Sequence, residues 1–399
     1  MLTQPKLNSP MTHRGLGMPA DSPFRIHLAH PWEAVYNTNA QSRTAKRVSR
    51  FARTCVDLAR RFRLHSWRIS LSLETNVANY TMTVGLRDYD HTRALADGRA
   101  KVDGVELKLV NVSPPSQIFL RMLHDEEFDA SEMSLSNYMI AVGKSDRRFV
   151  AIPVFPSRAF RHAYIWVNSR SGIQNPADLK GKKIGIADYS MTALLFVRGM
   201  LQHEYGVRPQ DVHWFRRRAE HVSIEIPAGI RIDNIAKGET LDDLLEHGAL
   251  DAVALTSPPR GFLSGIPYIK RLFADPRAVE ADYYRSTKIF PIMHMMVIRR
   301  AIYEKDPQLA VRLTEAFEAA KQLAFDAYDE GLSSLPWLNL DFEFARQVLG
   351  GDVYPYGVAK NRPTLEAATL YSSEQGLTKT KFTVDELFAP ETLHLFGEK

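Results

Sequence analysis

From residue 81 onward, short apolar segments with alternating or fully buried character are separated by segments with helical periodicity, which is typical of an α/β protein. The pattern predicts strands at 81–86, 105–112, 149–154, 164–167, 183–187, 212–215, 250–255 and 269–273. It predicts helices at 115–123, 190–205, 240–247, 301–328, 341–349 and 363–375, and a strand followed by a loop at 128–135. Because strands alternate with helices, we expect α/β architecture with largely parallel sheets.

Residues 1–80 lack this order. Five prolines interrupt the first 31 residues, which indicates an irregular, poorly ordered extension. Residues 43–63 have the pattern of a basic amphipathic helix, which is found in membrane-surface, nucleic-acid-binding or targeting segments. The simpler interpretation is an appendage, with Met82 as an alternative start of the protein.

The charge is unevenly distributed between these two parts. Residues 1–80 hold 12 Lys and Arg against 4 Asp and Glu, whereas the remainder holds 39 against 42. The excess of basic residues therefore lies in the extension, and the body gives no reason to expect a nucleic-acid partner. The single cysteine, Cys55, excludes an internal disulfide framework. No uninterrupted apolar run is long enough to cross a membrane and no secretion signal is recognisable, so we expect a cytoplasmic protein.

Searches for common catalytic motifs return nothing. The chain has no glycine-rich nucleotide loop, no nucleophile elbow and no H-E-x-x-H zinc motif. Asp88, Asp90 and His91 lie close together in sequence, but such groups near a turn are more often solvated or capping residues. We therefore expect no nucleotide cofactor, and nothing in the ligand spacing requires a metal.

Several polar residues stand in unusually apolar or strand-terminal positions. Residues 155–162 follow one predicted strand and precede another, and they include Ser157, Arg158, Arg161 and His162. His294 lies alone in the apolar run 290–296, and Glu132 and Ser134 alternate after a strand, which places them on one face. In open α/β sheets ligands bind beyond the carboxyl ends of strands, which favours a functional site here. The alternatives are that the histidines are core residues and that the arginines pair with acidic residues.

At these segments the chain resembles the 4,5-dihydroxyphthalate decarboxylases, over about residues 82–397. The resemblance rests most specifically on 152–162 (IPVFPSRAFRH) and 289–294 (IFPIMH), with further support from 88–93, 128–136, 176–181, 198–199, 204–207, 356–358, 361–362 and 386–390. Arg87 and His91 depart from the expected pattern, and residues 216–236 match only loosely.

The resemblance implies the fold of type II periplasmic binding proteins, in which two α/β lobes are joined by two crossover strands and the ligand binds in the cleft. The crossovers would lie at 163–167 and 293–298. One lobe would comprise 82–163 and 294–399, including a helical C-terminal tail, and the other 164–293. Both His162 and His294 would then lie beside the cleft.

The resemblance also implies a lyase of aromatic compound catabolism, specifically phthalate degradation. It would remove CO2 non-oxidatively from 4,5-dihydroxyphthalate and release protocatechuate, acting as a carboxy-lyase without a cofactor. Such chemistry requires a proton for the ring carbon, a base for the para hydroxyl and a clamp for the second carboxylate. We expect His162 and His294 to form the acid/base pair, with Glu132 orienting one of them or acting on a hydroxyl.

Arginine suits the clamp because its planar fork binds a carboxylate through two hydrogen bonds. The first choices are Arg158 and Arg161, with Arg93 and Arg260 contributing from opposite lobes. The helix start at 190–192 offers backbone N–H groups to a carboxylate. The remaining candidate binding residues are Ser157, Asp88, Ser134, Tyr189 and Thr192.

Two other functions fit the same residues. A solute-binding protein for an aromatic or other small organic anion would have the cleft and the arginines without acid/base groups, and an enzyme of this fold could act on another aromatic acid. We expect a small aromatic dicarboxylate as the binding partner, neither nucleic acid nor membrane, and a homo-oligomer associated through the helical tail.

Overall fold

The computed structural model describes residues 80–397. The predicted basic extension, including the amphipathic helix at 43–63, therefore lies outside the described residues, except for Tyr80, which opens the first strand. No helix among residues 80–397 is long and apolar enough to cross a membrane.

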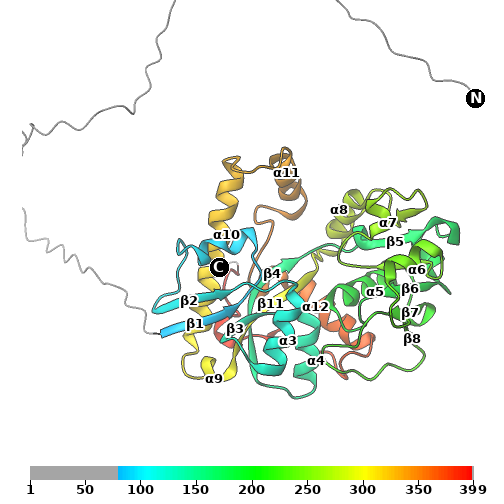
Figure 1. The fold of residues 1–399 in the computed structure, drawn as a ribbon. Helices are drawn as coiled ribbons and strands as arrows, with labels where there is room; N and C mark the ends of the chain where they lie inside the picture. Colours follow the sequence, from blue (N-terminus) through cyan, green and yellow to red (C-terminus); the bar gives the residue numbers. More distant parts are fainter. Residues whose placement is uncertain (1–79, 398–399) are drawn as a thin grey trace, which may run out of the picture. The chain divides into compact units, whose positions relative to one another are not determined.

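The first sheet has five strands in the order β2-β1-β3-β11-β4 (Figure 1). These strands are β1 (Tyr80–Gly85), β2 (Val105–Val110), β3 (Ala130–Ser134), β4 (Phe149–Arg158) and β11 (Ile292–Arg299). β1 runs parallel to β2 and β3, as predicted, whereas β11 is antiparallel to both of its neighbours, β3 and β4. A strand from much later in the sequence thus lies inside the sheet built by the first part of the chain.

The second sheet has six strands in the order β10-β5-β9-β6-β7-β8. They are β5 (Ile165–Asn168), β6 (Lys183–Ile186), β7 (His213–Arg216), β8 (Arg231–Asn234), β9 (Ala252–Ala254) and β10 (Ile269–Arg271). The central strands β9, β6, β7 and β8 are parallel, and β5 is antiparallel to β9 and β10. Each sheet is the centre of one α/β lobe. We call them the first and second lobes.

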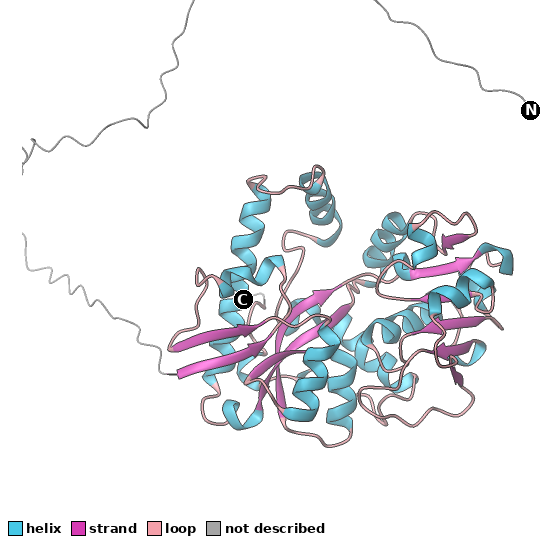
Figure 2. Cartoon of the chain, viewed as in Figure 1, coloured by secondary structure: helices cyan, strands magenta, loops and turns pink. Residues whose placement is uncertain are grey.

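Helices flank the strands of both sheets (Figure 2). They are α2 (Arg93–Ala96), α3 (Pro115–Asp125), α4 (Leu135–Gly143), α5 (Thr192–Tyr205), α6 (Leu241–His247), α7 (Arg260–Leu263), α8 (Pro276–Thr287), α9 (Arg300–Tyr303), α10 (Gln308–Asp329), α11 (Leu338–Leu349) and α12 (Val358–Glu374). The predicted helix at 190–205 is confirmed, and Gly206 ends it at φ +65, a left-handed conformation that glycine adopts without strain. The predicted helix at 301–328 is instead two helices, because Pro307 cannot continue the hydrogen-bonding pattern.

The main hydrophobic core extends through both lobes, and a smaller cluster around Trp166 lies in the second lobe. The main cluster of buried residues includes Met82, Val84 and Met295 from the first lobe and Leu194 and Trp214 from the second. α12, near the C-terminus, packs against both α4 of the first lobe and α5 of the second. The C-terminal part of the chain therefore joins the lobes in addition to the two segments that cross between the sheets.

The packing of α12 on α5 requires a glycine at position 199. A Cβ atom there would lie 2.1 Å from the ring of Tyr371, which is buried on α12. Gly143 at the end of α4 offers a matched control, because its Cβ would meet nothing closer than 3.5 Å.

We predict that Gly199→Ala lowers the free energy of unfolding by about 1–3 kcal/mol, although alanine is the better helix former. Gly143→Ala should change it by less than about 0.5 kcal/mol. Urea denaturation of both variants tests this, and equal stabilities would contradict the packing described.

Candidate active site

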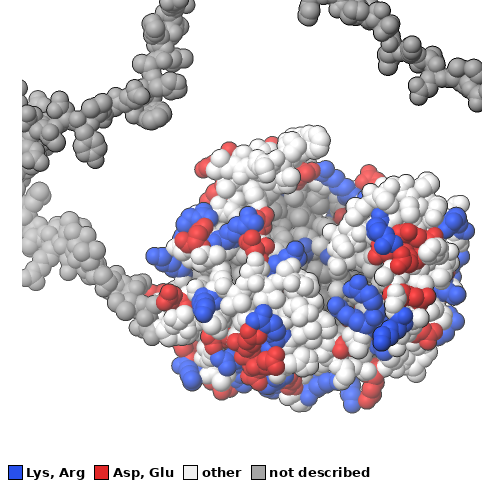
Figure 3. All heavy atoms as spheres, viewed as in Figure 1, with Lys and Arg blue, Asp and Glu red and all other residues white. Residues whose placement is uncertain are grey.

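A cavity of about 540 Å³ lies between the lobes, and the space-filling view shows a hollow there beside Lys and Arg side chains (Figure 3). Part of its lining comes from residues at or just beyond the carboxyl ends of strands in both sheets, where ligands bind in open α/β sheets. In the first lobe these residues are Arg87, Tyr89, Ser134 and Ser157. In the second lobe they are Ala187, Asp188, Arg217, Arg218, Thr256 and Ser257.

His294 lies in the wall of this cavity and is held by the buried carboxylate of Glu132. In the pairing of β11 with β3, His294 is opposite Ser134 and Glu132 is opposite Met296, two residues along. Side chains two residues apart on paired strands point to the same face, so Glu132 reaches Nδ1 of His294 diagonally. The Tyr89 hydroxyl donates to the same carboxylate oxygen, and the backbone N–H of Arg87 donates to the other at 3.2 Å.

These contacts keep the carboxyl group of Glu132 ionised. Burial alone would raise the pKa of Glu132, but the positive charge of His294 and the hydrogen bonds from His294, Tyr89 and Arg87 outweigh it and lower the pKa below its usual value. Glu132 is therefore a carboxylate, and Nδ1 of His294 carries the hydrogen that it donates. Nε2 of the same ring has no hydrogen-bond partner among the described residues. Burial and the neighbouring carboxylate raise the pKa of Tyr89 well above its usual value, so its hydroxyl stays protonated.

The cavity is lined by four arginines and a single carboxylate. Asp188 is paired with Arg218 at 2.7 Å, whereas the exposed Arg87 and Arg217 form no ion pair within residues 80–397. Arg161 is buried, donates from Nε to the carbonyl of Ala159 at 3.1 Å and lies over the Tyr164 ring, while one terminal nitrogen has no partner. Burial lowers the pKa of Arg161 to about 10, so it remains charged at neutral pH. The excess positive charge favours an anionic ligand.

Three helices begin at the cavity, which adds to its preference for anions. α3 starts beside Pro115 and Ser116, α4 beside its capping residue Ser134, and α5 beside Thr192 and Ala193. The hydroxyl groups of Ser134 and Thr192 lie 2.8 Å apart and connect the lobes. The helix start predicted at 190–192 thus lies at the cavity through Met191 and Thr192, but the N–H groups of Tyr189 and Ser190 donate to Glu220 instead.

His162 and Tyr189 are buried outside the cavity lining. The imidazole of His162 is surrounded by the rings of Tyr205, Phe273 and Tyr283, and neither ring nitrogen has a partner among the described residues. Burial lowers the pKa of His162 to about 4. The structure therefore places the two predicted histidines in different surroundings, and only His294 has a carboxylate beside it and a ring nitrogen at the cavity.

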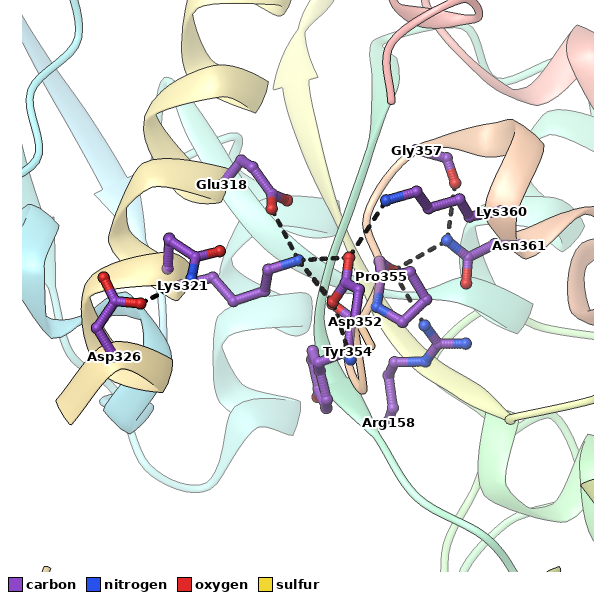
Figure 4. A network of polar contacts seen from close by, with 11 residues as sticks. Arg158, Glu318, Lys321, Asp326, Asp352, Tyr354, Pro355, Gly357, Lys360 and Asn361 are labelled. Atoms are coloured by element: carbon purple, nitrogen blue, oxygen red, sulfur yellow. Dashed lines mark hydrogen bonds and ion pairs between the residues drawn. The ribbon is translucent and has the colours of Figure 1, made fainter. Parts of the chain in front are cut away.

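Arg158 is likewise buried behind the cavity. Its guanidinium donates to the carbonyls of Pro355 at 3.0 Å and Phe290 at 2.8 Å, and it stacks on the Phe290 ring. Figure 4 shows Arg158 beside the loop at 352–357, which is also held by the buried Lys321 through Asp352 at 3.0 Å. Arg158 thus ties the end of β4 to this loop and to the chain segment that precedes β11.

Arg93, Asp88 and Arg260 lie on the exposed surface and do not line the cavity. Arg93 pairs with Asp88 at 3.0 Å, and Arg260 pairs with Asp243 at 2.5 Å. The sequence interpretation overlooked Tyr89, Asn137, Arg217, Arg218 and His221, all of which line the cavity. Arg217 and Arg218 could have been found from the sequence. They belong to a run of arginines at 216–218 directly after a predicted strand, and ligands bind beyond the carboxyl ends of strands.

Within residues 80–397 no group of three or more His, Cys, Asp or Glu side chains is arranged to hold a metal ion. The features that the cavity combines are a positively charged lining, three helix N-termini and a histidine oriented by a buried carboxylate. The protein is therefore a two-lobed α/β protein whose cleft holds a histidine against a buried carboxylate.

Comparison with known proteins identifies the family. The chain is 35% identical over 324 residues to a 4,5-dihydroxyphthalate decarboxylase of Comamonas testosteroni, covering 79% of this chain and 98% of that protein. It is 36% identical over 217 residues to the enzyme of the same name from Pseudomonas putida, covering 53% of this chain and 83% of that protein. The chain belongs to the 4,5-dihydroxyphthalate decarboxylase family, which confirms the resemblance found in the sequence.

Other comparisons concern the fold. Residues 103–224 match the protein family described as the periplasmic phosphonate-binding proteins of ABC transporters. Among solved structures, the aliphatic sulphonate binding protein SsuA from Escherichia coli has a TM-score of 0.48 at 16% identity, covering 79% of this chain and 99% of that one. The desulfurization enzyme DSZB has a TM-score of 0.44 at 17% identity, covering 78% and 98%.

The surroundings of His162 predict a structural role that is visible in the pH dependence of stability. Its folded pKa of about 4 lies below the value of about 6.5 expected in the unfolded chain, so the unfolded state takes up the proton first as the pH falls. The stabilising contribution of neutral His162 is therefore complete above about pH 6.5 and is lost progressively toward pH 4.

We predict that, between pH 7.5 and pH 5, the protein loses about 2 kcal/mol more unfolding free energy than the variant His162→Phe does. Urea denaturation at both pH values measures this difference. The variant should keep near-normal activity at pH 7.5. If the unfolding free energies of the protein and of His162→Phe changed equally with pH, the proposed burial of neutral His162 would be contradicted.

Proposed function

We propose that this protein is a carboxy-lyase that converts 4,5-dihydroxyphthalate to protocatechuate and CO2 without a change of oxidation state. The observation that carries the proposal is the placement of His294, oriented by the buried Glu132, in the wall of a cavity lined by arginines. Membership in the 4,5-dihydroxyphthalate decarboxylase family supports the same reaction.

The reaction needs a proton at the carbon that bears the departing carboxylate, because loss of CO2 from the intact ring would leave an unstabilised aryl anion. Electron release from the para hydroxyl allows that carbon to accept a proton, and a C–H bond forms there. The C–C bond to the carboxylate then breaks, its electron pair restores the aromatic ring, and CO2 leaves. One proton is consumed in each turnover.

His294 is suited to deliver this proton from Nε2. Its Nδ1–H donates to Glu132, so the carboxylate stabilises the imidazolium form that acts as the acid. Tyr89 and the Arg87 backbone hold Glu132 in place through hydrogen bonds of their own. After the transfer, His294 is neutral and regains a proton from solvent.

The carboxylate that stays on the ring fits the group formed by Arg161 and the N-terminus of α5. Arg161 lines the cavity and has no ion pair among the described residues, so its guanidinium has N–H groups to donate to a carboxylate. Arg87 and Arg217, both without ion pairs among the described residues, are suited to draw in the second negative charge.

A solute-binding protein for an organic anion is the second candidate. The match of residues 103–224 to periplasmic substrate-binding proteins favours it. Binding of an anion does not require a histidine held by a buried carboxylate. The pair of His294 and Glu132 therefore favours the enzyme. An enzyme acting on another aromatic acid would share the dyad, and product identification separates it from the proposed reaction.

We further propose phthalate degradation as the metabolic setting, the cytoplasm as the compartment and a homo-oligomer as the assembly. The support for an oligomer is a run of exposed apolar side chains at the start of α11 and in the loop before it, comprising Leu332, Leu335, Trp337 and Leu340.

The proposal is tested by incubating purified protein with 4,5-dihydroxyphthalate, measuring CO2 release and identifying the product by mass spectrometry. We expect protocatechuate at a catalytic rate, with or without a chelator. Tight binding without turnover would favour the binding protein instead.

We predict that His294→Gln lowers kcat about 10³-fold, because the ring carbon then lacks its proton donor. Glu132→Gln should lower kcat about 10²-fold, since a neutral amide stabilises the imidazolium less well. The matched control is His162→Phe, which leaves the cavity lining unchanged. Comparable turnover in His294→Gln and the control would exclude His294 as the acid.

Arg161→Met should raise KM for 4,5-dihydroxyphthalate at least tenfold, because one charge-assisted clamp on the carboxylate is lost. Steady-state kinetics measure this change, and Arg93→Met, on the exposed surface, is the control. A KM that is unchanged in Arg161→Met would contradict the assignment of the clamp.

A further inference from the structure

Three arginines among the described residues are almost fully buried, with exposed fractions between 1% and 9%: Arg158, Arg161 and Arg198. None of the three has a carboxylate within ion-pairing distance inside residues 80–397, in contrast to the buried Lys321, which pairs with Glu318 and Asp352. Burying a charge without a partner is unfavourable, so each of these guanidinium groups calls for an explanation. Arg161 faces the cavity and Arg158 ties three chain segments together, but Arg198 has no role in the chemistry described above.

Arg198 lies on α5 and is held by neutral partners. Its Nε–H donates to Oε1 of Gln375 at 2.7 Å, and a terminal nitrogen donates to the carbonyl of Tyr189 at 2.7 Å. The guanidinium stacks on the ring of Tyr189 at 3.7 Å, and its other terminal nitrogen has no partner. Gln375, which follows α12, is itself fixed because its amide donates to the carbonyl of Leu195 at 2.9 Å.

The charge of Arg198 lies directly behind the cavity wall. The carbonyl that it binds belongs to Tyr189, which lies between the lining residues Asp188, its neighbour, and Met191, two residues further on. The two nearest acidic residues are both paired with other cations: Asp188 with Arg218 at 2.7 Å and Glu220 with Arg216 at 3.2 Å. The positive charge of Arg198 is therefore not compensated locally, and protein interior rather than water separates it from the cavity.

The proposed reaction changes the charge of the ligand, because a dicarboxylate enters and a monocarboxylate leaves. A fixed charge attracts a ligand in proportion to the charge that the ligand carries. We propose that Arg198 makes the cavity selective for dianions over monoanions, which favours retention of the substrate and release of the product, without contacting either. This inference rests on the proposed function.

The test compares equilibrium binding of two unreactive ligands, phthalate as the dianion and benzoate as the monoanion, by calorimetry at pH 8. At an effective dielectric constant near 20, removing one charge weakens binding by roughly tenfold per ligand charge. In Arg198→Met the Kd of benzoate should therefore rise about tenfold and that of phthalate about a hundredfold. Equal changes for the two ligands would overturn the proposal, because a purely structural defect does not depend on ligand charge.

A second pair of variants decides the question if Arg198→Met does not fold. Gln375→Glu is nearly isosteric and places a carboxylate against Arg198, which compensates its charge while the guanidinium remains in place. Gln375→Met removes both hydrogen bonds of the Gln375 amide and adds no charge. We expect the preference for phthalate over benzoate to fall about tenfold in Gln375→Glu and to stay near the wild-type value in Gln375→Met. The same preference in both variants would overturn the proposal.

The failure of this inference and the failure of the proposed function give different results. Catalytic release of CO2 together with an unchanged preference in the Arg198 and Gln375→Glu variants would overturn the role of Arg198 alone. The opposite result is a preference for phthalate that depends on Arg198, with no CO2 release from 4,5-dihydroxyphthalate. It would overturn the proposed decarboxylase function, whereas the selectivity of the cavity for dianions would stand.

Discussion

Glu132 and His294 meet only because β11 returns from the second lobe and inserts between β3 and β4 of the first sheet. This pairing places a carboxylate and an imidazole on one face, with the carboxylate buried and the imidazole in the cavity wall. A buried carboxylate is stable only when it is paired, so the fold keeps Glu132 ionised by surrounding it with His294, Tyr89 and a backbone N–H. The orientation of His294 is therefore a consequence of how the sheet is assembled.

The same assembly gathers positive charge around one cavity. Carboxyl ends of strands from both sheets, three helix N-termini and the guanidinium groups of Arg161 and Arg217 converge on one cavity. Cross-lobe hydrogen bonds such as Ser134–Thr192 and the packing of α12 on α5 hold the two halves of this surface together. Glu132 and His294 come from the first lobe, whereas Arg217, Arg218 and the α5 terminus come from the second, so both lobes are needed to form the cavity.

Much of the fold could be predicted from the sequence, but partners distant in the chain could not. The helix at 190–205 was recognisable from its apolar pattern and Gly206, whereas α4 was missed because residues 135–142 are all buried and show no amphipathic period. His162, in a group of polar residues, and His294, alone in an apolar run, were both predicted to act as acid or base, yet one faces three aromatic rings and the other a carboxylate. Arg158 and Arg161, three residues apart, likewise point to different partners, since strand pairing and loop packing decide where each side chain lies.

The most direct test of the account is to run the reaction in D2O and to locate the deuterium in the product by NMR. If His294, recharged from solvent, protonates the carbon that loses CO2, each protocatechuate molecule formed will carry one deuterium, on the carbon next to the one that keeps its carboxylate. Protocatechuate with hydrogen at that position, deuterium only at another ring carbon, or an oxidised product would contradict ring protonation as the central step.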